Sequence, residues 1–393
     1  MRVTHVITRL IVGGAQENTV ASVLGLQSKL GLEVRLISGP TTGPEGSLES
    51  SFHDRPGTLH IARHLVRPVH PWHDSLALFE LTRLLREQKP DLVHTHSGKA
   101  GILGRLAARK AGVPIIIHTV HGPSFGSFQG PLANHLFTHA ERIAAQVTTH
   151  FVTVADAMTR QYLAAGIGRP GQYTRIFSGF DLDPYLRRLP EPETRTRLGF
   201  TAKDFVVGKI ARLTSLKGYE DLLAAAPELV RRCPRIKFLL VGAGPWRERF
   251  ENTIRQTGLQ HHFVLTGLVP PSEIPRLVAV MDMLVHLSLR EGLPRALPQA
   301  LAAARPVVAT DCDGAAEVCL EDETGFLIPP HDAPALIRRV LQLEADPALR
   351  QKLGQRGQAF VKERFPVQRM VDDLHGLYLR LLSSARPAAA HHA

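Results

Sequence analysis

The chain has 393 residues and a formal net charge of +11, with 44% hydrophobic and 21% charged residues. This length exceeds what one ordinary core fills, so it predicts two domains of comparable size, and the composition is typical of a globular protein. No apolar run approaches the roughly 20 residues of a transmembrane helix, and the three cysteines lack the spacing of a disulfide framework or a zinc site.

Residues 1–7 have the pattern of a strand that begins at once, which is not the pattern of a signal peptide. Free thiols fit a cytoplasm, so we expect a cytoplasmic protein. The positive charge lies mainly in residues 1–190 and could serve a nucleic acid, an anionic membrane or a phosphorylated substrate, with a plain solvated face as the alternative. No nucleic-acid-binding motif accompanies it, so we expect no nucleic-acid partner.

Short apolar runs alternate with helical patterns along the chain, which predicts βαβ units and parallel sheets. In the first half we expect strands at residues 3–8, 33–38, 91–95, 115–119 and 151–154, and helices at 18–30, 76–88, 99–111, 133–146 and 155–165. In the second half we expect strands at 205–211, 236–241, 262–266, 283–287 and 306–309, and helices at 219–232, 246–257, 272–281 and 294–304.

The fold class predicted from this order is α/β, with two Rossmann-like, doubly wound parallel-sheet domains facing across a cleft. The first domain is expected over residues 1–183, a proline-containing linker over 184–201 and the second domain over 202–365. A helix over 366–385 is expected to pack back toward the first domain, and residues 386–393 are expected to be a disordered tail. Ligands of such sheets bind at the carboxyl ends of the strands.

Three motifs follow strands of the first domain. Gly13 and Gly14 allow a ligand to approach the backbone closely, although a tight turn is the alternative and the pair is not a dinucleotide fingerprint. His94 and His96 resemble a metal-binding pair, but no third ligand is evident in the sequence, so we expect no metal. Lys99 begins a helix and could meet the phosphate or hydroxyls of a substrate, with a simple capped helix as the alternative.

His121 closes another strand and precedes a glycine, so it could reach a sugar hydroxyl, with a structural histidine as the alternative. In the second domain Arg212 and Lys217 lie on a strand-to-helix connection. Two fixed cations beside a helix start suit a diphosphate, whose charge they neutralise as it departs.

Further residues of the second domain follow its other strands. Gly242 and Gly244 form a glycine loop that could line a nucleotide pocket, and the main chain of Leu268 and Val269 could contact a base edge. Glu291 precedes a helix start, where it could accept hydrogen bonds from sugar hydroxyls or simply complement the helix dipole.

The Glu291 motif continues into the predicted helix at 294–304. The N–H groups of Gly292 and Leu293, ahead of Pro294, would face phosphate. Gln299 lies about two helical turns after Glu291 and could line the same cleft.

The ordered motifs together resemble the retaining glycosyltransferases of family four, which have the GT-B fold. The resemblance is carried by Gly13-Gly14, residues 94–101, His121-Gly122, residues 178–181, Arg212 with Lys217, and residues 291–294. It implies sugar transfer from a nucleotide-sugar with retention of anomeric configuration and without an essential metal. Neither the motifs nor the resemblance suggests a bound cofactor.

The resemblance also implies a role for each motif. Arg212 and Lys217 would hold the donor diphosphate, His121 would contact the transferred sugar, and Glu291 would bind its hydroxyls. Gly13 and Gly14 would approach the phosphate from the first domain. The first domain is then the acceptor-binding one, and the acceptor is expected to meet Gln16, His96 and Lys99.

One residue departs from the family's pattern, which places two glutamates eight positions apart. The second position is Gln299 here, and an amide lacks the charge that strengthens a hydrogen bond to a ribose hydroxyl. The change puts donor affinity and the identity of the ribose contact in doubt.

The function predicted is transfer of a hexose or N-acetylhexosamine, from a UDP-sugar, to a saccharide or lipid-linked acceptor in the synthesis of a cell-surface polysaccharide, lipopolysaccharide or glycolipid. A nucleotide-sugar 2-epimerase or a sugar phosphorylase of the same fold is the nearest alternative. An NAD(P) oxidoreductase and a non-catalytic nucleotide-sugar-binding protein are more distant ones. Peripheral contact with an anionic membrane is expected from the basic first half and from residues 133–146, which have apolar positions at helical spacing, although a helix packed on the sheet is the alternative.

Overall fold

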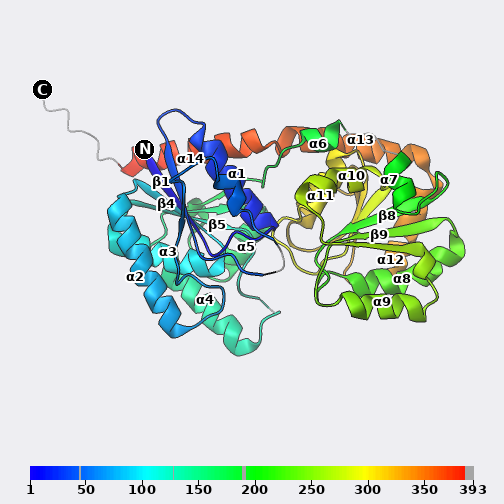
Figure 1. Cartoon of the computed structure of the whole chain (residues 1–393), viewed down its shortest axis with the longest axis horizontal. Helices are drawn as coiled ribbons and strands as arrows, with labels where there is room; N and C mark the ends of the chain where they lie inside the picture. Colours follow the sequence, from blue (N-terminus) through cyan, green and yellow to red (C-terminus); the bar gives the residue numbers. More distant parts are fainter. Residues whose placement is uncertain (44–45, 127, 188–191, 386–393) are drawn as a thin grey trace, which may run out of the picture. The chain divides into compact units, whose positions relative to one another are not determined.

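The computed structural model describes residues 1–43, 46–126, 128–187 and 192–385. The chain divides into two compact units, which we call unit 1 (Met1–Phe180 with Val367–Ala393) and unit 2 (Asp181–Pro366) (Figure 1). Within the described part of the chain, no helix combines the length and apolar character needed to cross a bilayer. The predicted tail at 386–393 and residues 188–191 of the predicted linker lie outside the described residues.

Unit 1 is built on a parallel sheet with the strand order β3-β2-β1-β4-β5-β6-β7. Its strands are β1 (Arg2–Ile7), β2 (Glu33–Ser38), β3 (Leu59–Ile61), β4 (Leu92–His96), β5 (Ile115–Val120), β6 (His150–Thr153) and β7 (Tyr173–Arg175). Its helices are α1 (Gly14–Gln27), η1 (Glu49–Phe52), α2 (Pro71–Gln88), α3 (Gly98–Ala111), α4 (Pro131–Ala145), α5 (Asp156–Ala164), η2 (Pro170–Gln172) and α14 (Val367–Ala385).

Alternating residues of these strands enter two separate cores, one on each face of the sheet. Val3 and Ile7 of β1 pack with α1 and α14, whereas Val6 packs with α2 and α3. Successive strand residues point to opposite faces of the sheet. Within one strand, odd-numbered and even-numbered residues therefore contact different helices. We call the side covered by α1 and α14 the α14 face.

Helix α14 completes the core on the α14 face. Its buried residues Met370, Leu374 and Tyr378 belong to the same cluster as Val3 of β1. It lies so close to α1 that a Cβ on Gly25 would come within 2.4 Å of a methyl carbon of Val371. Although it follows unit 2 in the sequence, α14 is therefore a structural part of unit 1.

Unit 2 has a second parallel sheet with the order β10-β9-β8-β11-β12-β13. Its strands are β8 (Phe205–Ile210), β9 (Ile236–Val241), β10 (Phe263–Gly267), β11 (Met283–His286), β12 (Val307–Thr310) and β13 (Gly325–Ile328). Its helices are α6 (Asp183–Leu186), α7 (Pro192–Arg197), α8 (Tyr219–Arg232), α9 (Arg247–Gln256), η3 (Gln260–His262), η4 (Pro271–Glu273), α10 (Ile274–Ala279), α11 (Ala296–Ala302), η5 (Asp313–Glu317), α12 (Ala333–Ala345) and α13 (Pro347–Arg364).

Both units confirm the predicted α/β class of doubly wound parallel sheets. In each sheet the strand order reverses direction once, between β1 and β4 in unit 1 and between β8 and β11 in unit 2. Loops that leave neighbouring strands at such a reversal turn to opposite faces, which opens a crevice at the carboxyl ends of those strands. The two reversals therefore mark where each unit should bind ligands.

Candidate functional site

The predicted cations and the predicted carboxylate of unit 2 lie at its strand reversal. Arg212 and Lys217 follow β8, and Glu291 follows the neighbouring strand β11. The backbone N–H of Leu289 donates to Leu216 O at 2.9 Å, so the two loops are joined directly. The two loops that the sequence analysis grouped are thus neighbours, because the parallel sheet brings them together across 74 residues of chain.

Lys217 and Glu291 form an ion pair in this crevice. Lys217 Nζ lies 2.5 Å from Glu291 Oε1, and the side chains are 19% and 21% exposed. His286 Nε2 lies 3.4 Å from the same oxygen. Burial by itself would raise the pKa of Glu291, but the contact with His286 and the charge of Lys217 outweigh it and hold that pKa well below its usual range. Glu291 is therefore ionised and can only accept hydrogen bonds.

Arg212 differs from Lys217 in having no side-chain partner among the described residues. Its side chain is exposed, and it forms no ion pair or hydrogen bond with any residue that the structure describes. Among the described residues Arg212 is thus an unpaired cation, whereas Lys217 is already oriented by Glu291. Such a pair of donors can neutralise charge without first breaking a contact at Arg212.

Three glycines of the site are required by backbone packing. A Cβ on Gly218, whose φ is +62°, would lie 1.8 Å from Leu287 O, so only glycine lets the β8 loop approach β11. A Cβ on Gly242 would lie 2.2 Å from Ala211 O, and one on Gly244 would lie 2.3 Å from Leu213 O. The loop after β9 is thus fitted against the Arg212 loop, in agreement with its predicted neighbourhood.

The residues after β10 and β11 are arranged partly as predicted. Leu268 is 54% exposed and follows the last residue of β10, where Gly267 O accepts from the N–H of Gly242 at 3.1 Å. The helix expected at 294–304 begins only at Ala296, so Gly292, Leu293 and Pro294 lie in the preceding loop. The N–H groups of Gly292 and Leu293 therefore do not belong to the first turn of a helix, contrary to the sequence-based expectation.

That loop is held by η5 instead. Asp313 Oδ2 accepts from the Glu291 N–H at 2.7 Å, and Gly292 O accepts from the Gly314 N–H at 3.1 Å. Val269 and Gln299 are both half-buried, and Gln299 lies on α11.

Sequence reasoning missed Lys209, a fully buried lysine of β8. Its ammonium lies 4.9 Å from the centre of the Tyr219 ring and has no hydrogen-bond partner among the described residues. Burial, and then the nearby charge of Lys217, lowers the pKa of Lys209 to about 7. The sequence could have revealed it. Lys209 follows Phe205 and Val207 at every second position of β8, so its side chain points to the same core-facing side.

We expect Lys209→Met to raise the free energy of unfolding, with an effect that depends on pH. The lysine pKa is depressed by folding, so the folded protein carries the full penalty of this group at pH 7 and below. The penalty disappears as the pH rises toward the unfolded pKa of 10.5. The stabilisation by Lys209→Met should therefore be largest at pH 7 and shrink by pH 10, as urea unfolding can measure. The control Lys203→Met, at an exposed position, should change little; a pH-independent gain would contradict the prediction.

In unit 1 the predicted loop glycines lie at the strand reversal. Gly13 precedes α1, which begins at Gly14, and among the described residues a Cβ on Gly13 would meet the side chain of Gln16, whose Oε1 would lie at 2.9 Å. This neighbour is the end of a flexible side chain, so no backbone contact requires the glycine there. Lys99 is already held, because its Nζ donates to Pro68 O and pairs with Asp74. An acceptor that binds Lys99 would have to displace Asp74.

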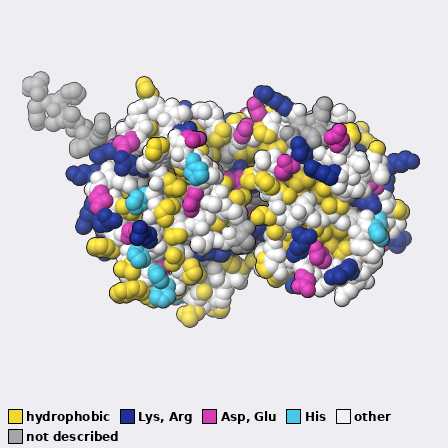
Figure 2. Space-filling view, viewed as in Figure 1, with side chains coloured by type: hydrophobic (Ala, Val, Ile, Leu, Met, Phe, Trp, Pro, Cys, Tyr) yellow, Lys and Arg dark blue, Asp and Glu magenta, His cyan; other side chains and the backbone are white. Residues whose placement is uncertain are grey.

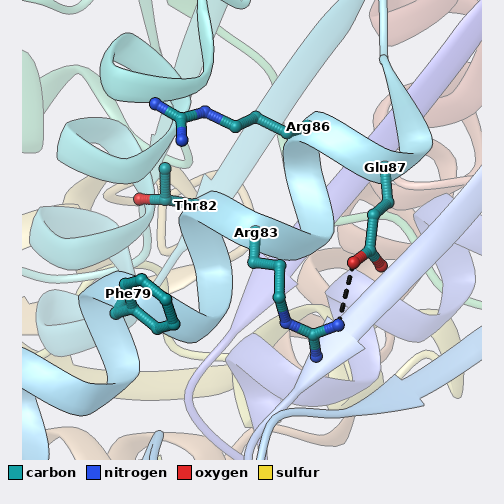
Figure 3. Close-up of a pocket in the computed structure, with 5 residues that line it drawn as sticks. All are labelled: Phe79, Thr82, Arg83, Arg86 and Glu87. Atoms are coloured by element: carbon teal, nitrogen blue, oxygen red, sulfur yellow. Dashed lines mark hydrogen bonds and ion pairs between the residues drawn. The ribbon is translucent and has the colours of Figure 1, made fainter.

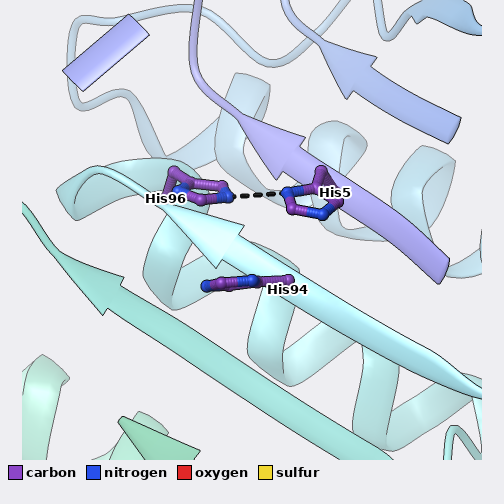
Figure 4. A group of neighbouring side chains, drawn as sticks. All are labelled: His5, His94 and His96. Carbon is purple, nitrogen blue, oxygen red and sulfur yellow. Dashed lines mark hydrogen bonds between the residues drawn. The ribbon is translucent and has the colours of Figure 1, made fainter. Parts of the chain in front are cut away.

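The predicted histidines lie in a buried cluster on the α14 face. His96 Nε2 is 2.9 Å from His5 Nδ1 (Figure 4). On its other side, His96 Nδ1 is 3.1 Å from His121 Nε2. Both ring nitrogens of His96 are thus occupied and its side chain is buried, so His96 can act on an acceptor only through the partly exposed His121. The expectation that His96 meets the acceptor directly does not fit this geometry.

The structure places a third histidine beside His94 and His96, which the sequence did not reveal; that no metal binds there stays a prediction. Parallel pairing places His5 of β1 opposite His94, and ring nitrogens of His5, His94 and His96 lie within 4.8 Å of one another. Burial lowers the pKa of His5 to about 3 and that of His121 to about 4. Burial and then the neighbouring rings hold the pKa values of His94 and His96 well below the usual range. All four rings are therefore neutral at pH 7.

A separate surface depression lies on α2. Its lining residues come from that one helix and include a 2.8 Å pair between Arg83 and Glu87 (Figure 3). The apolar part of its lining is Phe79, which is 72% exposed. It contains none of the predicted site residues, so we treat it as part of the surface of unit 1.

Both units match known families. Residues 13–177 match the "Glycosyl transferase 4-like domain" and residues 190–360 match "Glycosyl transferases group 1". EpsD of Bacillus subtilis (strain 168), which is named as a glycosyltransferase, is 31% identical over 314 residues, covering 77% of this chain and 80% of its own length.

The chain belongs to the GT4-type glycosyltransferases. A second relative, the UDP-Gal:alpha-D-GlcNAc-diphosphoundecaprenol alpha-1,3-galactosyltransferase of Escherichia coli, is 27% identical and covers 81% of this chain and 82% of its own length.

A solved structure supports the predicted GT-B fold of this glycosyltransferase. It is Anabaena Alr3699/HepE in complex with UDP-glucose, with a TM-score of 0.81 and 21% identity, and the match covers 97% of this chain and all of that one. The sequence-based recognition of the family is confirmed.

Proposed function

We propose that this glycosyltransferase moves a hexose or N-acetylhexosamine from a UDP-sugar to a saccharide or lipid-linked acceptor, with retention of anomeric configuration and without a metal. The observation that carries the proposal is the Lys217–Glu291 pair at the strand reversal of unit 2, with Arg212, which has no side-chain partner among the described residues, on the same loop as Lys217. Two cations there suit the diphosphate, and an ionised carboxylate suits the hydroxyls of the sugar that leaves it.

The choice of donor and acceptor is supported by a relative. The E. coli relative is named for UDP-Gal as donor and for a diphosphoundecaprenol-linked acceptor. We therefore place a UDP-sugar first among donors, and a lipid-linked or saccharide acceptor of cell-surface polysaccharide or glycolipid synthesis first among acceptors. The half-buried Gln299 is proposed to contact the ribose, where it can accept one hydroxyl hydrogen bond and donate another.

The reaction proposed breaks the bond between the anomeric carbon and the β-phosphate oxygen and forms a bond from that carbon to the acceptor oxygen on the same face. The acceptor proton passes to the departing phosphate oxygen, so no protein base is needed. Arg212 and Lys217 neutralise the charge that develops on the diphosphate. Glu291 orients the sugar through its hydroxyls, and His121 is proposed to hydrogen-bond the same sugar.

A panel of nucleotide-sugars tests the proposal. UDP-glucose, UDP-galactose, UDP-N-acetylglucosamine and GDP-mannose are compared for protection against thermal unfolding, since a ligand of the native state raises its stability. At least one UDP-sugar should protect, and the anomeric proton couplings of the product with a saccharide or lipid-diphosphate acceptor should match those of the donor. Formation of an epimer from the donor alone would indicate a 2-epimerase instead. Formation of a sugar phosphate with added inorganic phosphate would indicate a phosphorylase instead.

We also propose that unit 1 contacts an anionic membrane from the cytoplasmic side. Leu132, Leu136 and Ile143 of α4 are 83%, 57% and 42% exposed, and they share a helix face with His135 and His139. The apolar stripe of α4 is therefore open to solvent, which supports the membrane alternative over a helix packed on the sheet by its apolar side.

Helix α2 adds a second exposed apolar surface to unit 1. Val69, just before α2, and Trp72 and Phe79 within it are 63%, 67% and 72% exposed. Figure 2 shows apolar and histidine side chains gathered over α2. Arg63 and Arg67, which precede α2 in the sequence, are also exposed and could attract anionic headgroups.

We expect the full-length protein to float with phosphatidylglycerol vesicles at low salt, and the double variant Leu132→Glu/Leu136→Glu to lose most of this retention. Two carboxylates in the apolar stripe oppose both insertion and the anionic surface. The matched control Leu30→Glu/Leu379→Glu changes two other exposed leucines, 101% and 51% exposed, and should keep floating. Equal retention of both double variants would contradict the role of α4.

A further inference from the structure

A continuous chain of hydrogen bonds connects β5 to the partly exposed ring of His121. Thr119 Oγ1 lies 2.6 Å from His94 Nε2, and His94 Nδ1 lies 2.5 Å from the hydroxyl of Tyr378. That hydroxyl lies 3.3 Å from His5 Nε2, and His5 then contacts His96, which contacts His121. The alternation of strand side chains explains the grouping. Odd-numbered residues of β1 and β5 and even-numbered residues of β4 point to the α14 face, where α14 supplies Tyr378.

Two arrangements of the protons satisfy every group of this chain. A third, in which the Tyr378 hydroxyl accepts from both His94 and His5, would leave its own hydrogen buried with no acceptor among the described residues, so we set it aside. A neutral imidazole carries one N–H and one bare nitrogen, and the tyrosine hydroxyl has one hydrogen. Each contact needs one donor and one acceptor, so fixing the tautomer of one ring fixes the donor in the next contact and thereby the tautomer of the next ring. Every ring therefore carries its hydrogen on Nδ1, or every ring carries it on Nε2.

The hydroxyl of Thr119 distinguishes the two arrangements. Thr119 is 4% exposed, and His94 is the only side-chain partner of its hydroxyl among the described residues. If Thr119 accepted from His94, its own hydrogen would be buried without an acceptor, which is unfavourable. Thr119 therefore donates to His94 Nε2.

The remaining donors follow from this one. His94 Nδ1–H donates to Tyr378, the Tyr378 hydroxyl donates to His5 Nε2, and His5 Nδ1–H donates to His96 Nε2. His96 Nδ1–H then donates to Nε2 of His121. The hydrogen of His121 must lie on Nδ1, which has no hydrogen-bond partner among the residues described.

We propose that Thr119 and Tyr378 are positioning residues that fix His121 as the Nδ1–H tautomer, so that its free nitrogen presents a hydrogen-bond donor to an oxygen of the transferred sugar. The sugar as ligand rests on the function proposed above, whereas the tautomer does not. His121 in this form donates to an oxygen and cannot take up a proton at Nδ1. This assignment agrees with a reaction in which the departing phosphate receives the acceptor proton.

The tautomer can be measured directly in the full chain without any substrate. Protein labelled with ¹⁵N-histidine is studied by long-range ¹H–¹⁵N correlation, and the His121 signals are assigned by their loss in His121→Gln. We expect a protonated Nδ1 and a bare Nε2 for His121. Thr119→Val keeps the shape of the side chain but removes the donor, so the His121 signals should move toward the Nε2–H form. Tyr378→Phe should do the same, and Thr119→Ser should restore the wild-type signals.

A matched control separates this effect from general disturbance of the sheet. Thr95 is also buried and bonds to His118, on the opposite face, so Thr95→Val should leave the tautomer of His121 unchanged. With a donor that the enzyme turns over, Thr119→Val should lower kcat about tenfold with little change in KM.

Three outcomes would overturn the proposal. They are an Nε2–H ring at His121 in the wild type, an unchanged tautomer in Thr119→Val, or stoichiometric zinc bound by His5, His94 and His96 in the purified protein. Because the spectra need no sugar, inactivity toward every donor would refute the proposed function and leave the tautomer assignment standing.

Discussion

Lys217→Ala should lower the turnover of the nucleotide-sugar by about 10²–10³-fold, the usual effect of removing one fixed group that stabilises developing charge. The effect should fall mainly on kcat, because the charge on the leaving diphosphate is greatest in the transition state. Loss of the ammonium also leaves Glu291 without its 2.5 Å partner, so the carboxylate loses the contact that orients it. Initial rates with the UDP-sugar that protects best against thermal unfolding provide the measurement.

Two controls make the Lys217 result specific. Lys352→Ala removes an exposed lysine of α13 in the same unit and should leave the rate within twofold of wild type. Urea unfolding of Lys217→Ala shows whether the loss of the ion pair has destabilised unit 2 enough to affect the assay. A stable Lys217→Ala protein with a near-wild-type rate would remove Lys217 from the reaction.

Gly218→Ala should destabilise the protein by about 3–5 kcal/mol, the combined cost of overpacking and of a side chain at positive φ. The new methyl would lie 1.8 Å from Leu287 O, a backbone atom that cannot rotate away. The β8 and β11 loops would have to separate, and this change would also displace Lys217 from Glu291. The free energy of unfolding in urea and donor protection against thermal unfolding should fall together.

Gly258→Ala isolates the backbone cost from the clash. Gly258 has a φ of +70°, close to the +62° of Gly218, but a Cβ there meets no atom within 4 Å. We expect it to lose only about 1–2 kcal/mol and to keep donor protection. Similar losses for the two variants would show that the contact with Leu287 is not what makes Gly218 necessary.

The secondary structure was predicted best where strands are central and patterns are long. The bounds of β2, β9 and α8 match the sequence prediction. The edge strands β3 and β7 were missed because three residues are too few to establish a period of two.

The end of unit 2 was missed for two different reasons. Strand β13 is short and begins with Gly325, a weak strand former. Helix α12 had a readable start that the prediction overlooked, because Asp332 accepts from the Ala335 N–H and Pro334 follows it in the first turn.

In the candidate site, residues that follow predicted strands were found, whereas partners from distant parts of the chain were not. Arg212, Lys217 and Glu291 were found because each follows a predicted strand, and parallel sheets gather such positions. The partners of His94 could not be found by spacing, since Tyr378 lies 284 residues away and approaches from another helix. Strand parity alone could have placed His5, His94 and His96 on one face, but only the fold shows which helix covers them.

The position of α14 has a consequence for synthesis on the ribosome. Residues 1–180 emerge first, but the apolar side of their sheet is completed by Met370, Leu374 and Tyr378 near the end of the chain. Domains generally fold as they emerge, so unit 2 can become compact while unit 1 still exposes part of its interior. A nascent chain of this protein therefore keeps an apolar surface of unit 1 open while unit 2 is synthesised, and such exposed surface is what chaperones protect.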